Sequence, residues 1–142
     1  MRTGFVDTGA WIALLVPNDK FHRRARAFFQ TIAGDTRLIT SNYVMAETLT
    51  WLSYNKLRPA AYQLLSRVEA AEKLGYMDTE WVSAEIHEQA VDIFRRFDDQ
   101  DYSICDCTSF VVCERRRVDF AFGFDAHFRT MGIEVRPGAE DS

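Results

Sequence analysis

The sequence predicts an α/β protein in which a central, mainly parallel sheet of about five strands lies between two layers of helices. The order of the segments along the chain favours this three-layer α/β/α class. Short apolar segments with strand character alternate with longer segments whose apolar residues recur at helical spacing. No segment resembles a linker or a repeat, so we expect one domain over residues 1–142, ending in a flexible acidic tail at about 138–142.

The first half of the chain is expected to contain two strands and four helices. Residues 10–16 are apolar nearly all round, which fits a strand or a buried helix, and we prefer a short buried helix. Ser41 is placed to cap one helix, and Pro59 fits the first turn of another that ends at Gly75. The expected strands are 3–6 and 37–40, and the expected helices are 10–16, 21–33, 42–56 and 59–74.

The second half continues the alternation. Residues 76–82 are expected to form a strand interrupted by polar residues, whereas 118–124 is a strongly apolar strand. Ser83 and Ser103 stand at N-cap positions, where a serine hydroxyl accepts a free N–H group of the first helical turn. The remaining elements are helices at about 84–97 and 104–116, a short helix after Asp125 and a last strand at 133–136.

Composition excludes several classes of protein. With 47% hydrophobic and 27% charged residues, the chain is expected to be soluble and globular rather than disordered. No apolar run approaches the roughly 20 residues that span a bilayer. The first residues contain too few apolar positions for a secretory signal. We therefore expect a cytoplasmic protein with no membrane partner. The three cysteines lie within nine residues of one another and predict buried thiols rather than disulfides.

Four acids from distant parts of the chain are predicted to meet at one edge of the sheet. Asp7 and Asp125 directly follow the first and fourth strands, so both should lie at the carboxyl edge, where ligands bind in such sheets. Asp106 is in the first turn of a helix that leads into the fourth strand and therefore starts near the same edge. Glu47 is in the second turn of the helix after the second strand, amid apolar residues that predict substantial burial.

Converging carboxylates repel one another unless their pKa values rise or cations occupy the site. Mg²⁺ and Mn²⁺ prefer oxygen ligands, and two such ions about 4 Å apart can activate a water and stabilise the leaving oxygen of a phosphodiester. The net charge of −4 argues mildly against a nucleic-acid partner, but two divalent cations would neutralise the four acids. Simpler roles stay open for each acid. Asp7 and Asp125 could cap the helices that follow them, and Asp106 could form a capping box with Ser103. Glu47 could be a solvated residue on the face of its helix.

Four short segments resemble, in order, the acidic motifs of PIN domains, and especially those of the toxin ribonucleases of VapBC-type toxin–antitoxin modules. Each segment carries one of the four acids, at residues 5–14, 44–49, 103–110 and 122–128. The Arg-Pro pair at 136–137, after a closing strand, is also typical of the family. Any single motif is weak, but the ordered set covers nearly the whole chain.

The resemblance implies a PIN-like fold and the hydrolysis of RNA with Mg²⁺ or Mn²⁺. It carries the acids over as catalytic and metal-binding residues, with two of them, Asp7 and Asp106, as the most direct ligands. Glu47 and Asp125 complete the acidic site, and Thr8 matches a position where a hydroxyl supports it. The resemblance also implies a homodimer and a cognate antitoxin, so the expected function is that of a VapC-type endoribonuclease toxin.

Two other classes of protein fit parts of this pattern. A phosphoacceptor signalling domain also places acids around Mg²⁺ at strand ends, but here Asp7 has no second acid beside it and no lysine follows the last strand. A catalytically silent PIN-like module that binds RNA or protein is the main alternative. Metal binding without cleavage would favour that alternative.

Several further residues have two interpretations. His127 follows the fourth acid closely enough to face the site. The arginines at 115–117 end a helix, where positive charge is favourable, or contact RNA. Trp11, Tyr43 and Trp51 could stack on bases, but the apolar runs around them favour the core.

Overall fold

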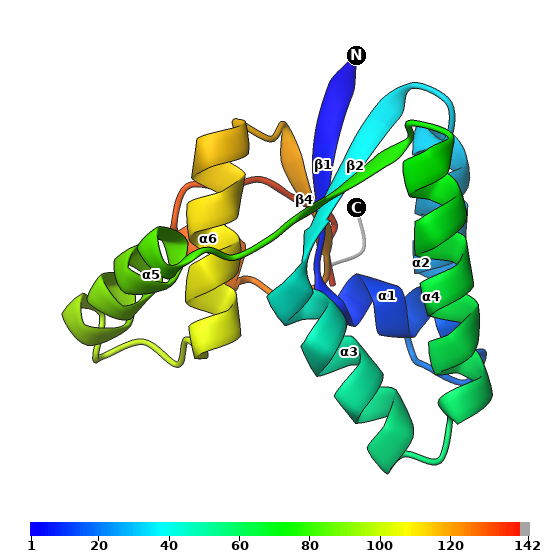
Figure 1. The fold of residues 1–142 in the computed structure, drawn as a ribbon, viewed down its shortest axis with the longest axis horizontal. Coiled ribbons are helices and arrows are strands. Elements are labelled where there is room, and N and C mark those ends of the chain that lie inside the picture. The colour runs from blue at the N-terminus through cyan, green and yellow to red at the C-terminus, as the bar shows by residue number, and fades with distance from the viewer. Residues whose placement is uncertain (140–142) are drawn as a thin grey trace.

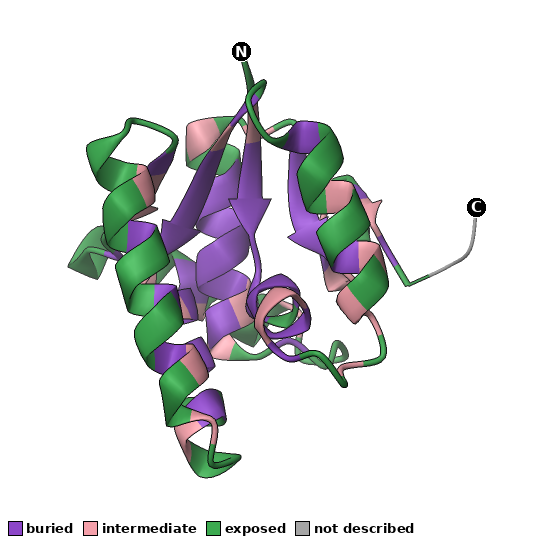
Figure 2. Ribbon diagram, turned by 90° about the vertical axis from the view of Figure 1, so that its right-hand side faces the viewer, coloured by how far each residue is buried: buried purple, intermediate pink, exposed green. Residues whose placement is uncertain are grey.

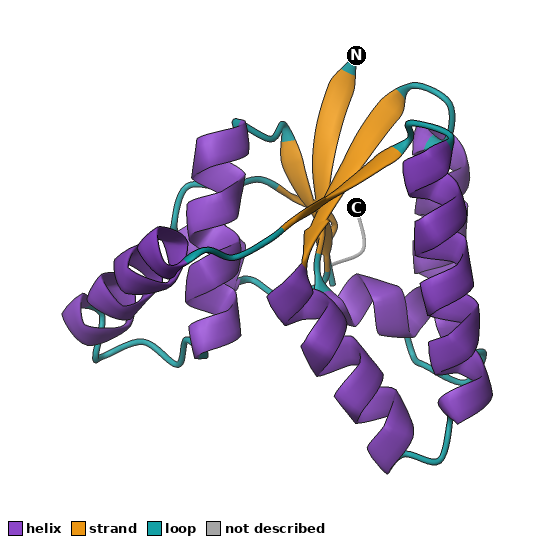
Figure 3. Ribbon diagram, viewed as in Figure 1, coloured by secondary structure: helices purple, strands orange, loops and turns teal. Residues whose placement is uncertain are grey.

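The computed structural model describes residues 1–139 and shows a five-stranded sheet with helices around it (Figure 1; Figure 3). Every pair of neighbouring strands is parallel, in the spatial order β3-β2-β1-β4-β5. The strands are β1 (Arg2–Val6), β2 (Thr36–Ser41), β3 (Met77–Glu80), β4 (Phe120–Gly123) and β5 (Val135–Pro137). The helices are α1 (Thr8–Leu15), α2 (His22–Ile32), α3 (Asn42–Tyr54), α4 (Arg58–Lys73), α5 (Ala84–Arg96), α6 (Ile104–Arg116) and α7 (His127–Thr130).

The strand order places a crevice beside β1. From β1 the chain builds outward through β2 and β3, and then returns to the other side of β1 with β4 and β5. In open parallel sheets, ligands bind beyond the carboxyl ends of the strands where the building direction reverses. Here the reversal falls between β1 and β4, which pair from Gly4 with Phe120 to Val6 with Phe122. Residues that follow these two strands are therefore at the crevice.

Helices cover both faces of the sheet. α5 and α6 pack against each other on one side, while α1, α2 and α4 lie on the other (Figure 1). α3 extends from the carboxyl end of β2 and contacts α1, α4 and α6, so it joins the two helical layers. This arrangement confirms the predicted three-layer α/β/α class. None of the helices in the described part of the chain is both long enough and apolar enough to cross a bilayer.

The core between these layers is rich in phenylalanine. Phe110, Phe120, Phe122 and Phe128 are among the fully buried side chains. Figure 2 shows the strands buried over most of their length, whereas each outer helix exposes one side. A close approach explains the glycine in β1, because a Cβ at Gly4 would lie 2.7 Å from the Phe120 ring.

The segment after β1 is the main difference from the predicted elements. α1 begins at Thr8, directly after Asp7, rather than at residue 10, and the structure selects helix over strand for this apolar run. At the other end of the chain, the Gly138 N–H donates to the Gly123 carbonyl at 3.1 Å. The first residue of the expected flexible tail is therefore still hydrogen-bonded to the residue that ends β4. Residues 140–142, which complete that tail, lie outside the described residues.

Candidate functional site

Two of the predicted acids follow closely after the strands that flank the crevice. Asp7 follows β1, and its backbone N–H donates to the Phe122 carbonyl in β4 at 3.0 Å, which continues the strand pairing up to the acid. Asp125 lies two residues after the end of β4. Both side chains line a cleft of about 460 Å³ that Glu47 and Asp106 also line. The structure therefore brings all four predicted acids together.

Asp7 is the most deeply placed of these acids, with only 8% of its surface exposed. It occupies the N-cap position of α1, but its side chain makes no capping hydrogen bond with the described helix, so capping does not explain it. Burial raises its pKa from 3.8 to about 7, and the negative charge of Asp106 is the next largest cause. The charges of Asp125 and Glu47 add to this rise, while the Thr8 N–H opposes it. Asp7 thus carries the repulsion expected of converging carboxylates.

Asp106 combines a structural role with a place in the cleft. Its Oδ2 accepts the Ser103 N–H at 2.9 Å, while Ser103 Oγ accepts the Asp106 N–H at 3.0 Å. This reciprocal pair is the predicted capping box at the start of α6. The same carboxylate lines the cleft, and its charge raises the pKa of Asp7. Asp106 therefore has both roles, and the capping box orients a carboxylate of the site.

Glu47 reaches the cleft from a helix that is less buried than predicted. α3 buries one stripe, formed by Val44, Thr48 and Leu52, and Glu47 itself is exposed. The expectation of substantial burial is wrong because α3 projects beyond the sheet, where only the side that faces its neighbouring helices is covered (Figure 3). Although Glu47 is exposed, its negative charge still adds to the rise in the pKa of Asp7.

His127, the first residue of α7, faces two of the acids. Its Nδ1 atom lies 3.3 Å from Asp106 Oδ2 and 3.2 Å from Asp125 Oδ2. Asp125 also accepts the His127 backbone N–H with its Oδ1 at 2.9 Å, so it helps to cap the short helix while facing the cleft. The interpretation in which His127 faces the site is confirmed.

Two details of the cleft fit a divalent cation. The Thr8 hydroxyl is buried and has no hydrogen-bond partner within residues 1–139, although Thr8 lines the cleft. Since buried hydroxyls are nearly always paired, this one is available to a water or ligand in the cleft. A Cβ at Gly123 would lie 3.6 Å from Asp7 Oδ2, so glycine leaves the space beside that carboxylate free. Carboxylates with a spare hydroxyl match the oxygen ligands that Mg²⁺ and Mn²⁺ prefer.

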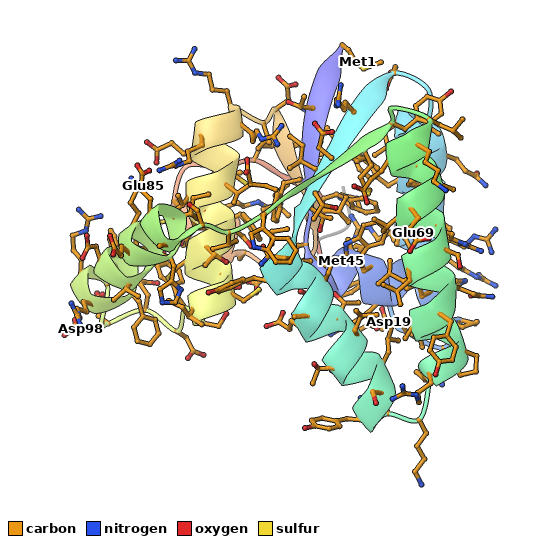
Figure 4. The ribbon with its side chains drawn as sticks, viewed as in Figure 1. Met1, Asp19, Met45, Glu69, Glu85 and Asp98 are labelled. Atoms are coloured by element: carbon orange, nitrogen blue, oxygen red, sulfur yellow. The ribbon has the colours of Figure 1, made fainter. Side chains whose placement is uncertain are left out.

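The cleft also contains residues that the sequence patterns did not single out. Asp19, Lys20 and Phe21 come from the turn between α1 and α2, where Figure 4 labels Asp19, and Phe124 follows β4. The Phe21 and Phe124 rings are stacked with their centroids 4.3 Å apart. Lys20 Nζ lies 4.9 Å from the centroid of the Phe21 ring. The Pro-Asn dipeptide at 17–18 marked this turn in the sequence, but only the fold brings the turn to the acids.

Trp51 is not the core residue that its apolar neighbours predicted. It is 38% exposed and lines the cleft, one helical turn after Glu47. The buried stripe of α3 passes through Leu52 instead. For Trp11 the prediction is confirmed, because it is 7% exposed and its Nε1 donates to the buried Thr40 Oγ1 at 3.3 Å.

The arginines at the end of α6 have structural partners. Arg115 Nη2 lies 2.8 Å from Glu85 Oε1. Arg116 lies 3.3 Å from Asp78 Oδ2 and 2.8 Å from Glu80 Oε1. These ion pairs join α6 to α5 and β3, away from the residues that line the cleft. They favour a structural role over RNA contact for Arg115 and Arg116.

Fold and site together define a class of protein: a parallel α/β sheet whose carboxyl edge gathers the four predicted carboxylates in one cleft. The PIN domain family model matches residues 4–134. The chain therefore belongs to the PIN-domain family, as its four motifs predicted.

Comparisons with individual proteins show which kind of PIN-domain protein this chain resembles. The chain is 33% identical, over 94% of its length and 98% of the relative's, to the 23S rRNA-specific endonuclease VapC20 of Mycobacterium tuberculosis. The crystal structure of that Sarcin–Ricin loop cleaving toxin matches with a TM-score of 0.79 and 32% identity, covering 92% of this chain and 95% of the other. VapBC2 from Rickettsia felis, bound to a DNA fragment from its promoter, shares the fold at a TM-score of 0.69 and 10% identity, covering 94% and 97%. The predicted similarity to VapC-type toxins is confirmed.

Proposed function

We propose that this protein is a metal-dependent endoribonuclease that hydrolyses RNA phosphodiester bonds and acts as the toxin of a VapBC-type toxin–antitoxin pair. The observation that carries the proposal is the convergence of Asp7, Glu47, Asp106 and Asp125 in one cleft. The buried Thr8 hydroxyl in the same cleft supports it, and so does the 33% identity to a named endonuclease.

The carboxylates of the cleft would hold Mg²⁺ or Mn²⁺, with Asp7 and Asp106 as the most direct ligands. When bound, such cations supply a nucleophilic water at neutral pH and neutralise charge on the leaving oxygen. Asp7 must be ionised to take part, and its pKa of about 7 means that cation binding displaces a proton from it near neutral pH. Thr8 can exchange hydrogen bonds with water in the cleft, and the capping box holds Asp106 in place.

The rest of the cleft suits a single-stranded RNA segment. Trp51 presents an exposed indole on the rim, where a nucleobase can stack without regard to its identity. Lys20 is the one basic residue among the described residues that line the cleft, and it offers a positive charge to the RNA backbone. Together they would place a phosphodiester over the acids, which by themselves repel it.

We propose ribosomal RNA as the substrate class. The support is the identity of 33% over 94% of this chain to an endonuclease specific for 23S rRNA. The acids cannot distinguish one RNA from another, because the phosphodiester has the same chemistry in every RNA. Discrimination therefore falls to the shape of the surface around the acids, which includes the stacked pair of Phe21 and Phe124.

A cognate antitoxin, a homodimer and a cytoplasmic location complete the proposal. An apolar groove of about 790 Å³ between α1, α2 and α4, lined among others by Leu14, Phe29, Leu64 and Tyr76, offers a surface for an apolar segment of the antitoxin. The homodimer rests on the resemblance to VapC-type toxins. The free, buried cysteines agree with a reducing compartment. Native masses of the protein alone and co-expressed with its antitoxin would test both assemblies.

Cleavage of ribosomal RNA by the purified protein tests the enzymatic proposal. Reactions contain EDTA, Mg²⁺ or Mn²⁺ and compare the wild type with Asp7→Asn and with Asp98→Asn, a matched control in the exposed loop that follows α5 (Figure 4). We expect metal-dependent cleavage by the wild type and by Asp98→Asn, and none by Asp7→Asn. Metal binding by a folded wild type that cuts no RNA would overturn the nuclease assignment in favour of a silent binding module.

A further inference from the structure

His127 provides a nitrogen donor at the acidic cleft, in addition to the carboxylates. Its Nδ1 atom is nearly equidistant from two carboxylate oxygens, at 3.3 Å from Asp106 Oδ2 and 3.2 Å from Asp125 Oδ2. One ligand atom from each of these residues lies within 4.8 Å of the others. Adjacent ligands of a six-coordinate ion with bonds of about 2.1 Å are about 3 Å apart. The two distances from Nδ1 therefore match those between adjacent ligands of one such ion.

The surroundings of the imidazole hold it in this orientation. The Tyr102 ring meets the His127 ring edge-on, with centroids 5.3 Å apart, and Tyr102 packs in turn against the buried Phe110. The backbone N–H of His127 is fixed by Asp125 Oδ1 at 2.9 Å. A side chain held from both ends loses little further freedom when it binds a ligand, so the donor atom is pre-organised.

The geometry points to His127 as an imidazole ligand of a cation site formed with Asp106 and Asp125, which makes the protein select Mn²⁺ over Mg²⁺. This inference rests on the proposed metal-dependent function and adds a nitrogen ligand to its oxygen set. Mg²⁺ is served by carboxylate, carbonyl and water oxygens, whereas imidazole binds first-row transition ions well. One nitrogen among the ligands therefore shifts the preference toward Mn²⁺.

A different role for His127 predicts the opposite response to its removal. If the imidazole is instead protonated and bridges the two carboxylates, it competes with a metal for the same oxygens. Removing a competitor strengthens the binding of Mg²⁺ and Mn²⁺ alike, whereas removing a ligand weakens the binding of Mn²⁺ most. The sign and the metal selectivity of the change therefore separate the two roles.

The experiment measures metal binding without RNA. Mn²⁺ is bound to the wild-type protein, to His127→Phe, which keeps a ring against Tyr102, and to His87→Phe as the matched control on α5. Pulsed electron paramagnetic resonance detects ¹⁴N coupled to the bound Mn²⁺, and calorimetry gives the Mn²⁺ and Mg²⁺ affinities. The His87 side chain is hydrogen-bonded to Tyr43 OH at 2.8 Å and, unlike His127, is not grouped with Asp106 and Asp125.

We expect a ¹⁴N coupling in the wild type and in His87→Phe, and its loss in His127→Phe. The Mn²⁺ affinity should fall at least about 10-fold in His127→Phe, given that loss of even an outer-shell partner costs 10–100-fold. The Mg²⁺ affinity should change much less. A wild type that binds Mn²⁺ without ¹⁴N coupling overturns the inference even if His127→Phe fails to fold, and so does an equal gain in both affinities.

Failure of this inference and failure of the proposed function are distinguishable. Metal-dependent RNA cleavage that Asp7→Asn abolishes, together with bound Mn²⁺ that shows no ¹⁴N coupling, rejects the nitrogen ligand and leaves the nuclease intact. A folded protein that binds neither Mn²⁺ nor Mg²⁺ rejects both.

Discussion

Two groups of acids on the sheet have opposite surroundings. At the crevice beside β1, Asp7 is buried with other carboxylates nearby, and its pKa is raised to about 7. On the edge strand β3, Asp78 is paired with Arg37 at 2.8 Å and with Arg116 at 3.3 Å, and these contacts, led by the hydrogen bond from Arg37, lower its pKa. The acids at β3 are therefore neutralised by the protein's own arginines.

The difference between these two groups separates a structural role from a functional one. Ion pairs at β3 connect it to β2 and α6 and require no outside partner. Among the described residues that line the cleft, Lys20 is the one lysine or arginine for several carboxylates. Such an arrangement costs stability unless a cation binds, and proteins concentrate perturbed pKa values of this kind at functional sites. The contrast leads to three experiments.

The largest expected effect is on catalysis. Asp106→Asn should reduce RNA cleavage more than about 100-fold, because it removes a charged ligand from a site whose electrostatic stabilisation is worth that much. Asp78→Asn should leave the rate of cleavage close to that of the wild type, because its partners lie outside the cleft. Initial cleavage rates at saturating Mn²⁺ provide the comparison. Equal losses in the two variants would remove the distinction between the groups.

The next effect is on the stability of the metal-free protein. The folded-state pKa of Asp7 lies above its ordinary value of 3.8, so the folded protein retains that proton while the unfolded chain loses it. Its contribution to the free energy of unfolding therefore falls as the pH rises from about 4 to about 7, by on the order of 4 kcal/mol. Asp7→Asn should be more stable than the wild type above this range, with a smaller difference at pH 4.

Asp78 should show the opposite dependence. Its folded-state pKa is lowered, so its contribution to stability is present above the ordinary pKa and is lost on acidification. Asp78→Asn should destabilise the protein at neutral pH by about 1 kcal/mol or less, because its partly exposed ion pairs are screened by solvent. Urea unfolding in EDTA between pH 4 and 8 measures both variants. A destabilised Asp7→Asn at pH 8 would contradict the convergence of charge.

The smallest expected effect concerns RNA binding. Trp51→Ala should weaken the binding of single-stranded RNA about 10-fold, as expected for the loss of one stacked base at 1–3 kcal/mol. Trp81 is the matched control, since it is 72% exposed and directly follows β3, next to the paired acids. Fluorescence anisotropy with a labelled oligonucleotide in Ca²⁺ measures both. Equal weakening by Trp51→Ala and Trp81→Ala would show that RNA does not prefer the cleft.

The sequence by itself determined the alternation of strands and helices and the meeting of the four acids. Both follow from local rules, because apolar periodicity defines each element and parallel strands present their carboxyl ends at one edge. Ser103 and Asp106 could be paired in advance for the same reason, since a capping box spans only one helical turn.

Only the tertiary structure decided which side chains surround those acids. The exposure of Trp51 depends on how far α3 projects beyond the sheet, and the orientation of His127 depends on Tyr102, which is 25 residues away in the sequence. The pairing of Arg37 and Arg116 with Asp78 joins three separate elements. Periodicity identifies the face of an element that will be buried, but the neighbours across that face are set by long-range packing, which no local pattern encodes.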